Sequence, residues 1–414
     1  MNSVERNEAL EFHRKARGKV QTFPTVNIRS ERHLAMAYVP GSTPVCEEIK
    51  RDPVLAFDYT GKANRLAEVS NGSALMSMGD AGAAASLPVL EGKCLLLKLF
   101  GDVNALPIAI DAKNYEEIMS FCRMLAPTVG GINIEDVSSP SSFYVVRELT
   151  EALDIPIFCD DQQGSAIIIL SAVKNSLKLI NITIEEARIV ILGAGSAGIA
   201  ATELLLVAGA KDVIVLDKSG ILGPSNQAMD PIQAALSEKT NPRGVKGGLD
   251  EAMEGADILV GLSQSGIVSK EHIKRMNKHP VVLALALPEP EISYDEAHEA
   301  GAYIYASGRI EDSNTILNVH AFPGLVRGAF DVRARKLTNS MLIAASDALS
   351  NMVDRRRLSP DHICPRFFGS ETTPRIAEAV GQAAIKDGVA LLAAPEGKIY
   401  SDTWNRLYGD IEHI

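Results

Sequence analysis

The stretch of sequence that decides the fold is residues 188–200, RIVILGAGSAGIA. It opens with an apolar run rich in isoleucine and valine, which predicts a buried strand. Gly193, Gly195 and Gly198 then form GxGxxG and lead into residues that predict a helix. In this context the first glycine allows a tight turn, the second lets the backbone approach a pyrophosphate, and the third lets helix and strand pack closely. Free N–H groups at the helix start favour phosphate, so the stretch predicts a dinucleotide-binding turn.

Strands and helices alternate on the C-terminal side of this turn. The helix within AGIAATELLLVAGAK is expected to stop at Gly209, and apolar runs that predict further strands follow it. These runs are DVIVLD (212–217), ADILVGLS (256–263), PVVLALALP (280–288) and AYIYAS (302–307). Such alternation is typical of a doubly wound parallel sheet, and it predicts a Rossmann-like dinucleotide-binding domain over residues 165–335.

The second predicted strand ends in Asp217, 19 residues after Gly198. An acid about 20 residues after the last glycine is the usual acceptor for a ribose 2′-hydroxyl, and a 2′-phosphate would face that carboxylate. The pattern therefore favours NAD over NADP. Lys218 and Ser219 follow directly and could soften this preference, so NADP stays open. The competing interpretation of the glycines is a purely structural turn in an α/β sheet.

The chain on either side of this block has a different pattern. Residues 1–164 contain helical segments and short apolar runs, so we expect a second α/β domain there. Its predicted strands are LAEVSNGSALM (66–76) and CLLLKLF (94–100), and NYEEIMSFCRML (114–125) predicts an amphipathic helix. Residues 336–414 carry helical segments that are expected to return to the first domain.

Composition narrows the classes of partner and compartment. The formal net charge is −11, which disfavours nucleic acid and anionic membranes as partners. The five cysteines are scattered without a CxxC, as expected in a reducing compartment. The N-terminus is charged and lacks the apolar core of a signal peptide, and no run of 18 apolar residues occurs. We therefore expect a cytoplasmic protein.

Two pairs of adjacent acids follow apolar runs in the first part of the chain. They are Glu135–Asp136, in GGINIEDVSSP, and Asp160–Asp161, in IPIFCDDQQGSA. Adjacent carboxylates in an apolar setting are costly unless they bind a cation, and oxygen ligands suit Mg²⁺ or Mn²⁺. The alternative is that each pair is a solvated loop. Lys93, placed just before the run read as a buried strand, is a candidate base if desolvation removes its proton.

Seven segments occur in an order that resembles the malic enzyme family, from about residue 30 to about residue 395. They are AYVPG, SNGSALMSMGDAGAAASLPVLEGK, GGINIEDVSSP, IPIFCDDQQGSAIIIL, VILGAGSAGIA, ASGR and NVHAFPGLVRGAFDVRA. A set this long is far more specific than a glycine motif alone. The resemblance implies an oxidoreductase that binds a nicotinamide dinucleotide and a divalent metal, and it suggests a homodimer.

The resemblance also implies a role for particular residues. Tyr38 matches the tyrosine that protonates the enolate, and Lys93 matches the lysine that takes the hydroxyl proton of malate. Asp160 matches the acid beside that lysine. The metal ligands implied are Glu135, Asp136 and Asp161. The cofactor contacts expected are Gly193, Gly195, Ser196, Ala197, Gly198, Asp217, Ser263 and Asn318.

Part of the expected substrate pocket departs from the family pattern. Leu287 stands where the compact members of the family have an asparagine that contacts substrate. Leu317 replaces the first of two asparagines, the second of which survives as Asn318, and His320 replaces an aliphatic residue. The pocket is therefore expected to favour a substrate less polar than malate. The alternative is that Asn314, His320 or Arg309 supplies the missing hydrogen bond and malate remains the substrate.

The sequence thus predicts a metal-dependent oxidative decarboxylase that acts on malate or a malate-like 2-hydroxy di-acid and reduces NAD. Two alternatives stay open. One is a non-decarboxylating or malolactic-type NAD enzyme on a related di-acid. The other is an NAD-binding sensor without turnover, which the joint presence of Tyr38, Lys93 and three ligand carboxylates disfavours.

Overall fold

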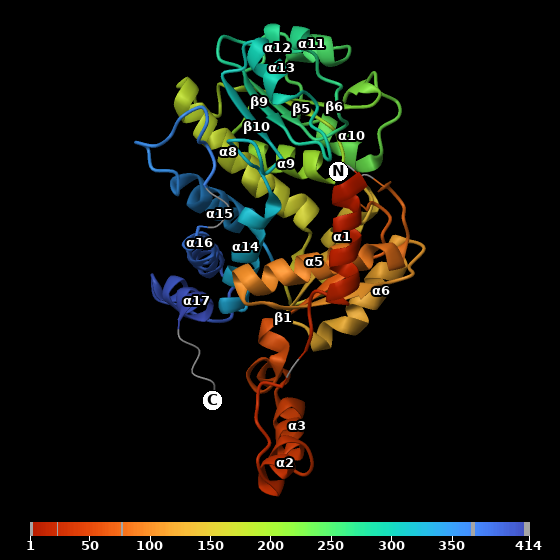
Figure 1. Cartoon of the computed structure of the whole chain (residues 1–414), viewed down its shortest axis with the longest axis vertical. Coiled ribbons are helices and arrows are strands. Elements are labelled where there is room, and N and C mark those ends of the chain that lie inside the picture. The colour runs from red at the N-terminus through yellow and green to blue at the C-terminus, as the bar shows by residue number, and fades with distance from the viewer. Residues whose placement is uncertain (1–2, 23, 76–77, 366–368, 410–414) are drawn as a thin grey trace.

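The computed structural model describes residues 3–22, 24–75, 78–365 and 369–409. Two parallel β-sheets lie one after the other along the chain, and helices pack on both (Figure 1). The fold is therefore α/β, with a doubly wound larger sheet and a second, smaller α/β sheet, as the sequence predicted. The predicted limits of the domains at residues 164 and 335 stay a prediction.

The larger sheet has the strand order β10-β9-β8-β5-β6-β7. All neighbouring strands in it are parallel except β6 and β7, which form a short antiparallel hairpin. The strands are β5 (Arg188–Leu192), β6 (Asp212–Asp217), β7 (Gly220–Ile221), β8 (Ile258–Gly261), β9 (Val281–Ala284) and β10 (Ile304–Ser307). The four apolar runs predicted as strands and the strand before the glycines are all confirmed.

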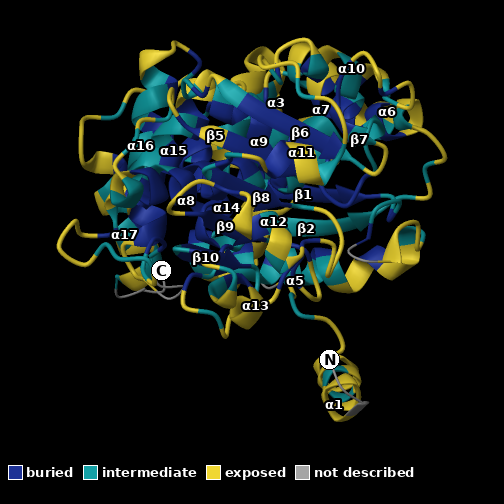
Figure 2. Cartoon of the chain, turned by 90° about the horizontal axis from the view of Figure 1, so that it is seen from above, coloured by how far each residue is buried: buried dark blue, intermediate teal, exposed yellow. Residues whose placement is uncertain are grey.

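Both faces of this sheet are buried, since successive strand residues point to opposite sides. Ile189 and Ile191 of β5 enter one apolar core, and Val190 and Leu192 enter another. Buried strands fill the centre of the molecule (Figure 2). The helices between the strands are α9 (Ser196–Val207), α10 (Pro231–Ser237), α11 (Leu249–Met253), α12 (Lys270–Lys274) and α13 (Tyr294–Glu299).

The smaller sheet has the strand order β2-β1-β3-β4 and is parallel throughout. Its strands are β1 (Arg65–Ser70), β2 (Asn104–Ala109), β3 (Gly131–Ile134) and β4 (Ile157–Phe158). The run read as a strand over 66–76 therefore pairs only to Ser70, and its last residue, Met76, lies outside the described residues. Helices α5 (Ala83–Gly101), α6 (Tyr115–Leu125) and α7 (Ser141–Ala152) join the strands, with the short helix η4 (Ala126–Thr128) after α6.

The strand predicted at CLLLKLF is wrong, because residues 94–100 lie inside α5. The buried residues of α5 recur at helical spacing: Ser86, Leu90, Cys94, Leu97 and Gly101. Residues three and four apart share one face of a helix, so this stripe packs on the sheet while the leucines between it are partly exposed. The apolar run is therefore one segment of a 19-residue helix, and Lys93 lies within that helix instead of before a strand.

Helices complete the C-terminal part of the described chain. The π-helix η5 (Asp160–Gly164) continues directly into α8 (Ser165–Ile180), which packs against both α9 and α15. The last helix contacts α5 of the smaller unit, where Arg406 faces Asp102. The helices that follow β10 in the described chain are η6 (Asn318–His320), α14 (Phe322–Asp331), α15 (Asn339–Asn351), α16 (Thr372–Lys386) and α17 (Lys398–Tyr408).

The N-terminal segment forms an arm that projects from the rest of the molecule (Figure 1). It comprises α2 (Glu31–Ala37), α3 (Ser42–Arg51), η1 (Pro53–Leu55) and α4 (Ala56–Tyr59), none of which has a buried residue. The helix η2 (Gly61–Asn64) then leads into β1. The first helix, α1 (Ser3–Ala16), is exposed and stands away from the body (Figure 2). Across the described ranges, no helix has the length and apolar character needed to cross a bilayer.

Candidate active site

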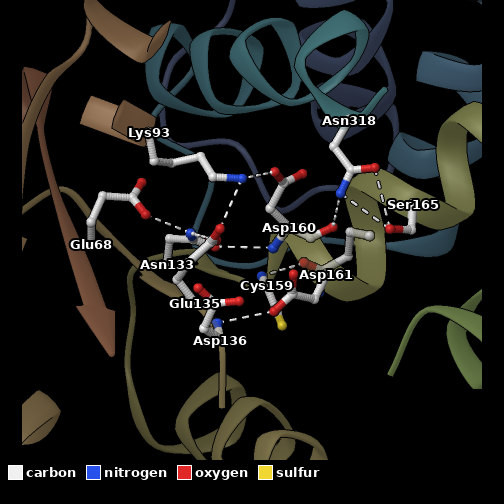
Figure 3. Close-up of polar contacts among 11 residues, drawn as sticks. Glu68, Lys93, Asn133, Glu135, Asp136, Cys159, Asp160, Asp161, Ser165 and Asn318 are labelled. Atoms are coloured by element: carbon white, nitrogen blue, oxygen red, sulfur yellow. Dashed lines mark hydrogen bonds and ion pairs between the residues drawn. The ribbon is translucent and has the colours of Figure 1, made fainter. Parts of the chain in front are cut away.

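A cluster of charged side chains lies at the carboxyl edge of the smaller sheet (Figure 3). Glu135 and Asp136 come directly after β3, and Asp160 and Asp161 come just after β4. The order β2-β1-β3 reverses direction between β1 and β3. Ligands of open parallel sheets bind at the carboxyl ends of strands where the order reverses. The topology therefore places both acid pairs at the expected position of a binding site.

Lys93 reaches this edge from α5, which covers one face of the sheet. Its Nζ lies 2.9 Å from Glu135 Oε1 and donates a hydrogen bond to Asp160 Oδ2. The lysine side chain is 18% exposed, while those of Glu135 and Asp160 are 4% and 1% exposed. The ring of Phe322 lies 5.7 Å from the ammonium group. The predicted base and two of the predicted acids are thus brought together where most of their surface is buried.

The charge balance around Lys93 differs from the sequence-based expectation. Burial alone would lower the pKa of Lys93, but the carboxylates of Asp160 and Glu135 outweigh it and hold this pKa well above its usual value. In the described arrangement these two carboxylates oppose the loss of the proton that desolvation was expected to favour. A neutral Lys93 needs some further positive charge beside the carboxylates.

The carboxylates themselves are crowded. Burial raises the pKa of Asp160 to about 6, although Lys93 opposes this rise. Burial, followed by repulsion from Glu135 and Asp136, raises the pKa of Asp161 well above its usual value. Asp161 Oδ2 accepts the backbone N–H of Asp136 at 3.0 Å, and Asp136 adopts a left-handed conformation with φ 51°. A single lysine thus faces four acids, which leaves an excess of negative charge.

This excess fits a divalent cation. The donor set contains only carboxylate oxygens, the ligands that Mg²⁺ and Mn²⁺ prefer. Within the described ranges, no three His, Cys, Asp or Glu side chains already converge around one point as metal ligands. Lys93 occupies one oxygen of Glu135, and the Asp136 N–H occupies one of Asp161. The charge and chemistry of the residues therefore suit a metal, and its binding would redirect these oxygens.

The sequence interpretation missed two residues of the cluster, Glu68 and Asn133. Asn133 Nδ2 donates to Glu68 Oε2 at 2.6 Å and to Glu135 Oε2 at 2.8 Å, and both Glu68 and Asn133 are fully buried. An acid in the middle of the apolar run RLAEVS was a signal that could have identified Glu68. The asparagine two residues before Glu135 was a second such signal, since alternate strand residues share one face.

The predicted dinucleotide turn has the geometry that its glycines imply. Gly193 has φ 124°, and a Cβ there would lie 2.3 Å from the carbonyl oxygen of Leu262. A Cβ on Gly198 would lie 1.8 Å from the carbonyl oxygen of Gly193. A Cβ on Gly195 would meet nothing within 4 Å, so that side of the turn is open to a ligand. Helix α9 begins at Ser196, followed by Ala197, and its N-terminus faces this space.

The other predicted cofactor residues lie around the carboxyl edge of the larger sheet. Asp217 ends β6, and its Oδ1 accepts the Ser219 N–H at 2.7 Å and Asn226 Nδ2 at 3.0 Å. Ser263 follows β8, where its N–H donates to the buried Glu291 at 2.8 Å. Both residues thus lie on the same sheet edge as the glycine turn.

Asn318 lies beside the acid cluster, whereas Leu287 of the predicted pocket lies at the edge of the larger sheet. Asn318 Nδ2 donates to the carbonyl oxygen of Asp160 at 3.2 Å and also contacts Ser165. Leu317, half-buried, immediately precedes Asn318. Leu287 follows β9 and is 55% exposed, with its Cδ2 3.2 Å from where a Cβ of Gly308 would lie. Leu287 therefore presents apolar surface at the edge of the larger sheet.

The acid cluster and the dinucleotide turn are neighbours. Helix α9, which starts at the glycine turn, packs against η5, which carries Asp160 and Asp161. Ser142 Oγ of α7 lies 3.3 Å from Ser196 Oγ at the start of α9. A dinucleotide on the turn would therefore end close to the carboxylates and Lys93.

Tyr38 is the one predicted site residue that lies apart from the others. It ends α2 on the projecting arm and is 72% exposed. The arm joins the sheet through η2, at the start of β1, whereas the cluster lies at the carboxyl ends of the strands. A strand of six residues spans about 20 Å. Tyr38 and Lys93 of one chain thus lie at opposite edges of the smaller sheet.

Comparisons with known proteins give one consistent family. A model described as "Malic enzyme, NAD binding domain" matches residues 162–385, and one described as "Malic enzyme, N-terminal domain" matches residues 17–119. The chain is 39% identical to the NAD-dependent malic enzyme of Geobacillus stearothermophilus, over 90% of this chain and 78% of that one. It is 37% identical to the bifunctional malic/malolactic enzyme of Bacillus subtilis, over 96% and 97%. The crystal structure of malic enzyme from Pyrococcus horikoshii matches with a TM-score of 0.93 at 39% identity, covering 97% of this chain and 95% of that one.

Proposed function

The chain belongs to the malic enzyme family, and from this premise we propose that the cluster around Lys93 is its catalytic centre. The protein is an NAD(P)-dependent oxidative decarboxylase that converts malate, or a malate-like 2-hydroxy di-acid, to a 2-oxo acid and CO₂. The observation that carries the proposal is the partly buried Lys93 ammonium group between Glu135 and Asp160, next to the helix that starts at the dinucleotide turn.

In this proposal Lys93 is the general base. It takes the proton of the substrate hydroxyl as C2 gives up its hydride to NAD(P). Asp160 accepts a hydrogen bond from Lys93 and holds its Nζ at the carboxyl edge of the sheet. Exclusion of water by the buried surroundings strengthens each of these electrostatic interactions.

We assign the divalent metal to Glu135, Asp136 and Asp161, which together offer oxygen ligands and excess negative charge. When bound, Mg²⁺ or Mn²⁺ would supply Lewis-acid stabilisation of the negative charge that develops on substrate oxygen as CO₂ leaves. Its charge would also offset the carboxylates that raise the pKa of Lys93. The lysine would then lose its proton more readily.

The proton donor, Tyr38, is proposed to come from a second copy of the chain. The tyrosine is at the wrong edge of its own sheet, and the arm that carries it has no buried residue in α2 or α3. Large apolar side chains are exposed along this arm, and such a surface is typical of a protein–protein contact. They include Leu34, Met36, Tyr38, Val39 and Val54. A homodimer in which each arm reaches the partner's cluster would explain both observations.

Complementation tests this arrangement. Tyr38→Phe and Lys93→Ala are each expected to be nearly inactive. Co-expression of the two variants should restore about a quarter of wild-type activity, because half of the dimers are mixed and each mixed dimer has one intact site. The measurement is the specific activity of the co-purified mixture against each variant alone. Recovery no greater than the sum of the two variants would show that Tyr38 does not act across subunits.

The cofactor preference is proposed to be NAD. Both hydrogen bonds to Asp217 go to Oδ1, which leaves Oδ2 for a ribose hydroxyl. Asp217→Ser should narrow the difference in kcat/KM between NAD and NADP, because it removes the repulsion of a 2′-phosphate. Asp295→Ser, which changes an exposed acid on α13 of the same unit, is the control. A wild-type enzyme with the higher kcat/KM for NADP would contradict the proposal.

The substrate is proposed to carry an apolar or bulkier substituent than malate, because Leu287 offers no hydrogen bond. Two of the three residues that might replace that bond, Asn314 and Arg309, already have other partners. Asn314 bonds the backbone of Tyr305, Pro360 and Ile363, and Arg309 pairs with Glu289 at 2.9 Å. A hydrogen bond to a charged group is worth about 1.5–3 kcal/mol, so its loss costs roughly 10–100-fold against malate.

Leu287→Asn is the matching experiment. We expect higher kcat/KM for L-malate and lower kcat/KM for alkyl-substituted malates, because the amide restores a bond and removes apolar surface. Ile310→Asn, a change of another exposed apolar side chain, serves as the control. Efficient turnover of malate by the wild type, unimproved by the substitution, would overturn the altered pocket while leaving the reaction class intact.

The reaction itself is tested with a panel of substituted malates, NAD and Mn²⁺, following reduced cofactor and CO₂ together. Equal amounts of both products support oxidative decarboxylation. Reduced cofactor without CO₂ would indicate a simple dehydrogenase, and CO₂ without reduced cofactor would indicate the malolactic-type reaction. The cytoplasm is the proposed location, because the five cysteines are unpaired, as is usual in a reducing compartment.

A further inference from the structure

Glu68 is an acid in the centre of a buried strand. In β1 it points to the same side of the sheet as Leu66, the side that α5 covers, while its neighbours Ala67 and Val69 enter the core on the other side. Its relative exposure is 0%. Buried carboxyl groups are costly unless they bond to a partner. Packing alone therefore does not explain an acid at this position of the strand.

The partner of Glu68 is Asn133, directly opposite in the parallel pair of β1 and β3. Asn133 Nδ2 donates to Glu68 Oε2 at 2.6 Å and to Glu135 Oε2 at 2.8 Å. Asn133 Oδ1 accepts the backbone N–H of Asp160 at 3.1 Å. One amide therefore joins three strands at the carboxyl edge of the sheet, and the close-up shows it beneath Lys93 (Figure 3).

These bonds fix which way the amide of Asn133 points. Its oxygen must face the Asp160 N–H, and its NH₂ group must face the two carboxyl groups. Glu135 and Asp160 are also the two residues that hold Lys93. Lys93 thus binds them from one side, and Asn133 binds the other oxygen of Glu135 and the backbone of Asp160 from the other side.

The surroundings of Glu68 raise its pKa. Burial, followed by repulsion from Glu135, raises the pKa of Glu68 to about 8. Glu68 Oε1 has no hydrogen-bond partner among the described residues. Burial thus favours the neutral form of the Glu68 carboxyl group. Its carbonyl oxygen still accepts the bond from Asn133.

We propose that Glu68 is a positioning residue, which orients the Asn133 amide and through it places Glu135 and Asp160 around Lys93. The inference rests on the proposed function, because it assigns Glu68 a role in the cluster that contains the catalytic base and a metal ligand. It predicts that loss of the acceptor on Glu68 disturbs the cluster even though Glu68 touches neither substrate nor cofactor.

Two substitutions separate positioning from packing. Glu68→Val fits a buried strand but removes the acceptor, so one N–H of Asn133 is left unpaired. It should lower kcat and weaken Mn²⁺ binding, each by about 10–100-fold, the usual cost of losing an outer hydrogen-bond partner of a metal ligand. Glu68→Gln keeps an oxygen acceptor of the same reach and should stay close to wild type in both.

The readouts are kcat, KM, the Kd for Mn²⁺ added alone, and the Tm of the metal-free protein. The Tm shows how far the unpaired Asn133 N–H and the smaller side chain of Glu68→Val destabilise the fold, and kcat and Kd are measured well below it. Ser176→Ala, a buried polar change on α8, is the control for altering a buried polar side chain.

The outcomes are decisive in both directions. Wild-type kcat and Mn²⁺ affinity in Glu68→Val would overturn the inference, and so would equal losses in Glu68→Gln and Glu68→Val. Loss in Glu68→Val, recovered in Glu68→Gln, would support it. An active Lys93→Ala enzyme would instead remove the proposed function, so the two failures are distinguishable.

Discussion

Replacing Lys93 with alanine is expected to lower kcat by at least about 10²–10⁴-fold, the usual contribution of a general acid–base group. The side chain is the one cation that contacts both Glu135 and Asp160, and no other described lysine or arginine pairs with either acid. NAD binding should change little, because the glycine turn belongs to the other sheet. The measurements are kcat with saturating metal and cofactor, and the Kd for NAD.

Lys98→Ala is the matched control for that substitution. Lys98 lies on the same helix, but its ammonium group pairs with Asp102 and is half exposed. Its loss should leave kcat near the wild-type value, since exposed ion pairs contribute little. Near wild-type turnover by Lys93→Ala at normal Mn²⁺ affinity would refute the assignment of the base.

Asp161→Asn is expected to abolish most turnover by weakening the metal site. Loss of a ligand charge should cost more than the roughly 10–100-fold typical of an outer partner. NAD binding should again be retained. The Tm of the metal-free protein should not fall, because burial and neighbouring acids already disfavour the ionised form of Asp161. Direct titration with Mn²⁺ and the kcat at saturating metal are the two measurements.

Asp154→Asn, an exposed acid just before β4, provides the control. It should bind Mn²⁺ as the wild type does. A chelator gives an independent check, since excess EDTA should abolish the activity of the wild-type enzyme and added Mn²⁺ should restore it. Full activity in excess EDTA would rule out an essential metal.

The sequence predicted the larger sheet well because its signals are local. The runs around Ile189 and Val213 are buried on both faces, so they are apolar throughout and short, as central parallel strands are. The run within α5 misled the prediction for the same reason. A short apolar segment has no clear period, and only the stripe through Leu90, Cys94 and Leu97 shows that it is helical.

Most residues of the candidate site were predicted from the sequence, but the effect of their charges on one another was not. The acids were identified from the sequence, but their effect on Lys93 depends on distances between α5, β3 and η5. Burial and charge act on the pKa in opposite directions, and the sum decides the result. The acid within the apolar run RLAEVS could have identified Glu68, but only the pairing of β1 with β3 shows that Asn133 joins it to Glu135.

By itself, the sequence determined the strand–turn–helix at Gly193, the acid at the end of β6 and the family to which the chain belongs. The turn and the acid depend on residues close together in the chain, whose conformational preferences act over one turn or one strand, and the family depends on the order of seven segments along the sequence. The tertiary structure alone decided that Lys93 meets Asp160, 67 residues away, that Asn133 bridges Glu68 and Glu135, and that Tyr38 lies beyond the reach of its own cluster. Electrostatic interactions between buried groups depend on separation in space, and separation along the chain does not reveal it.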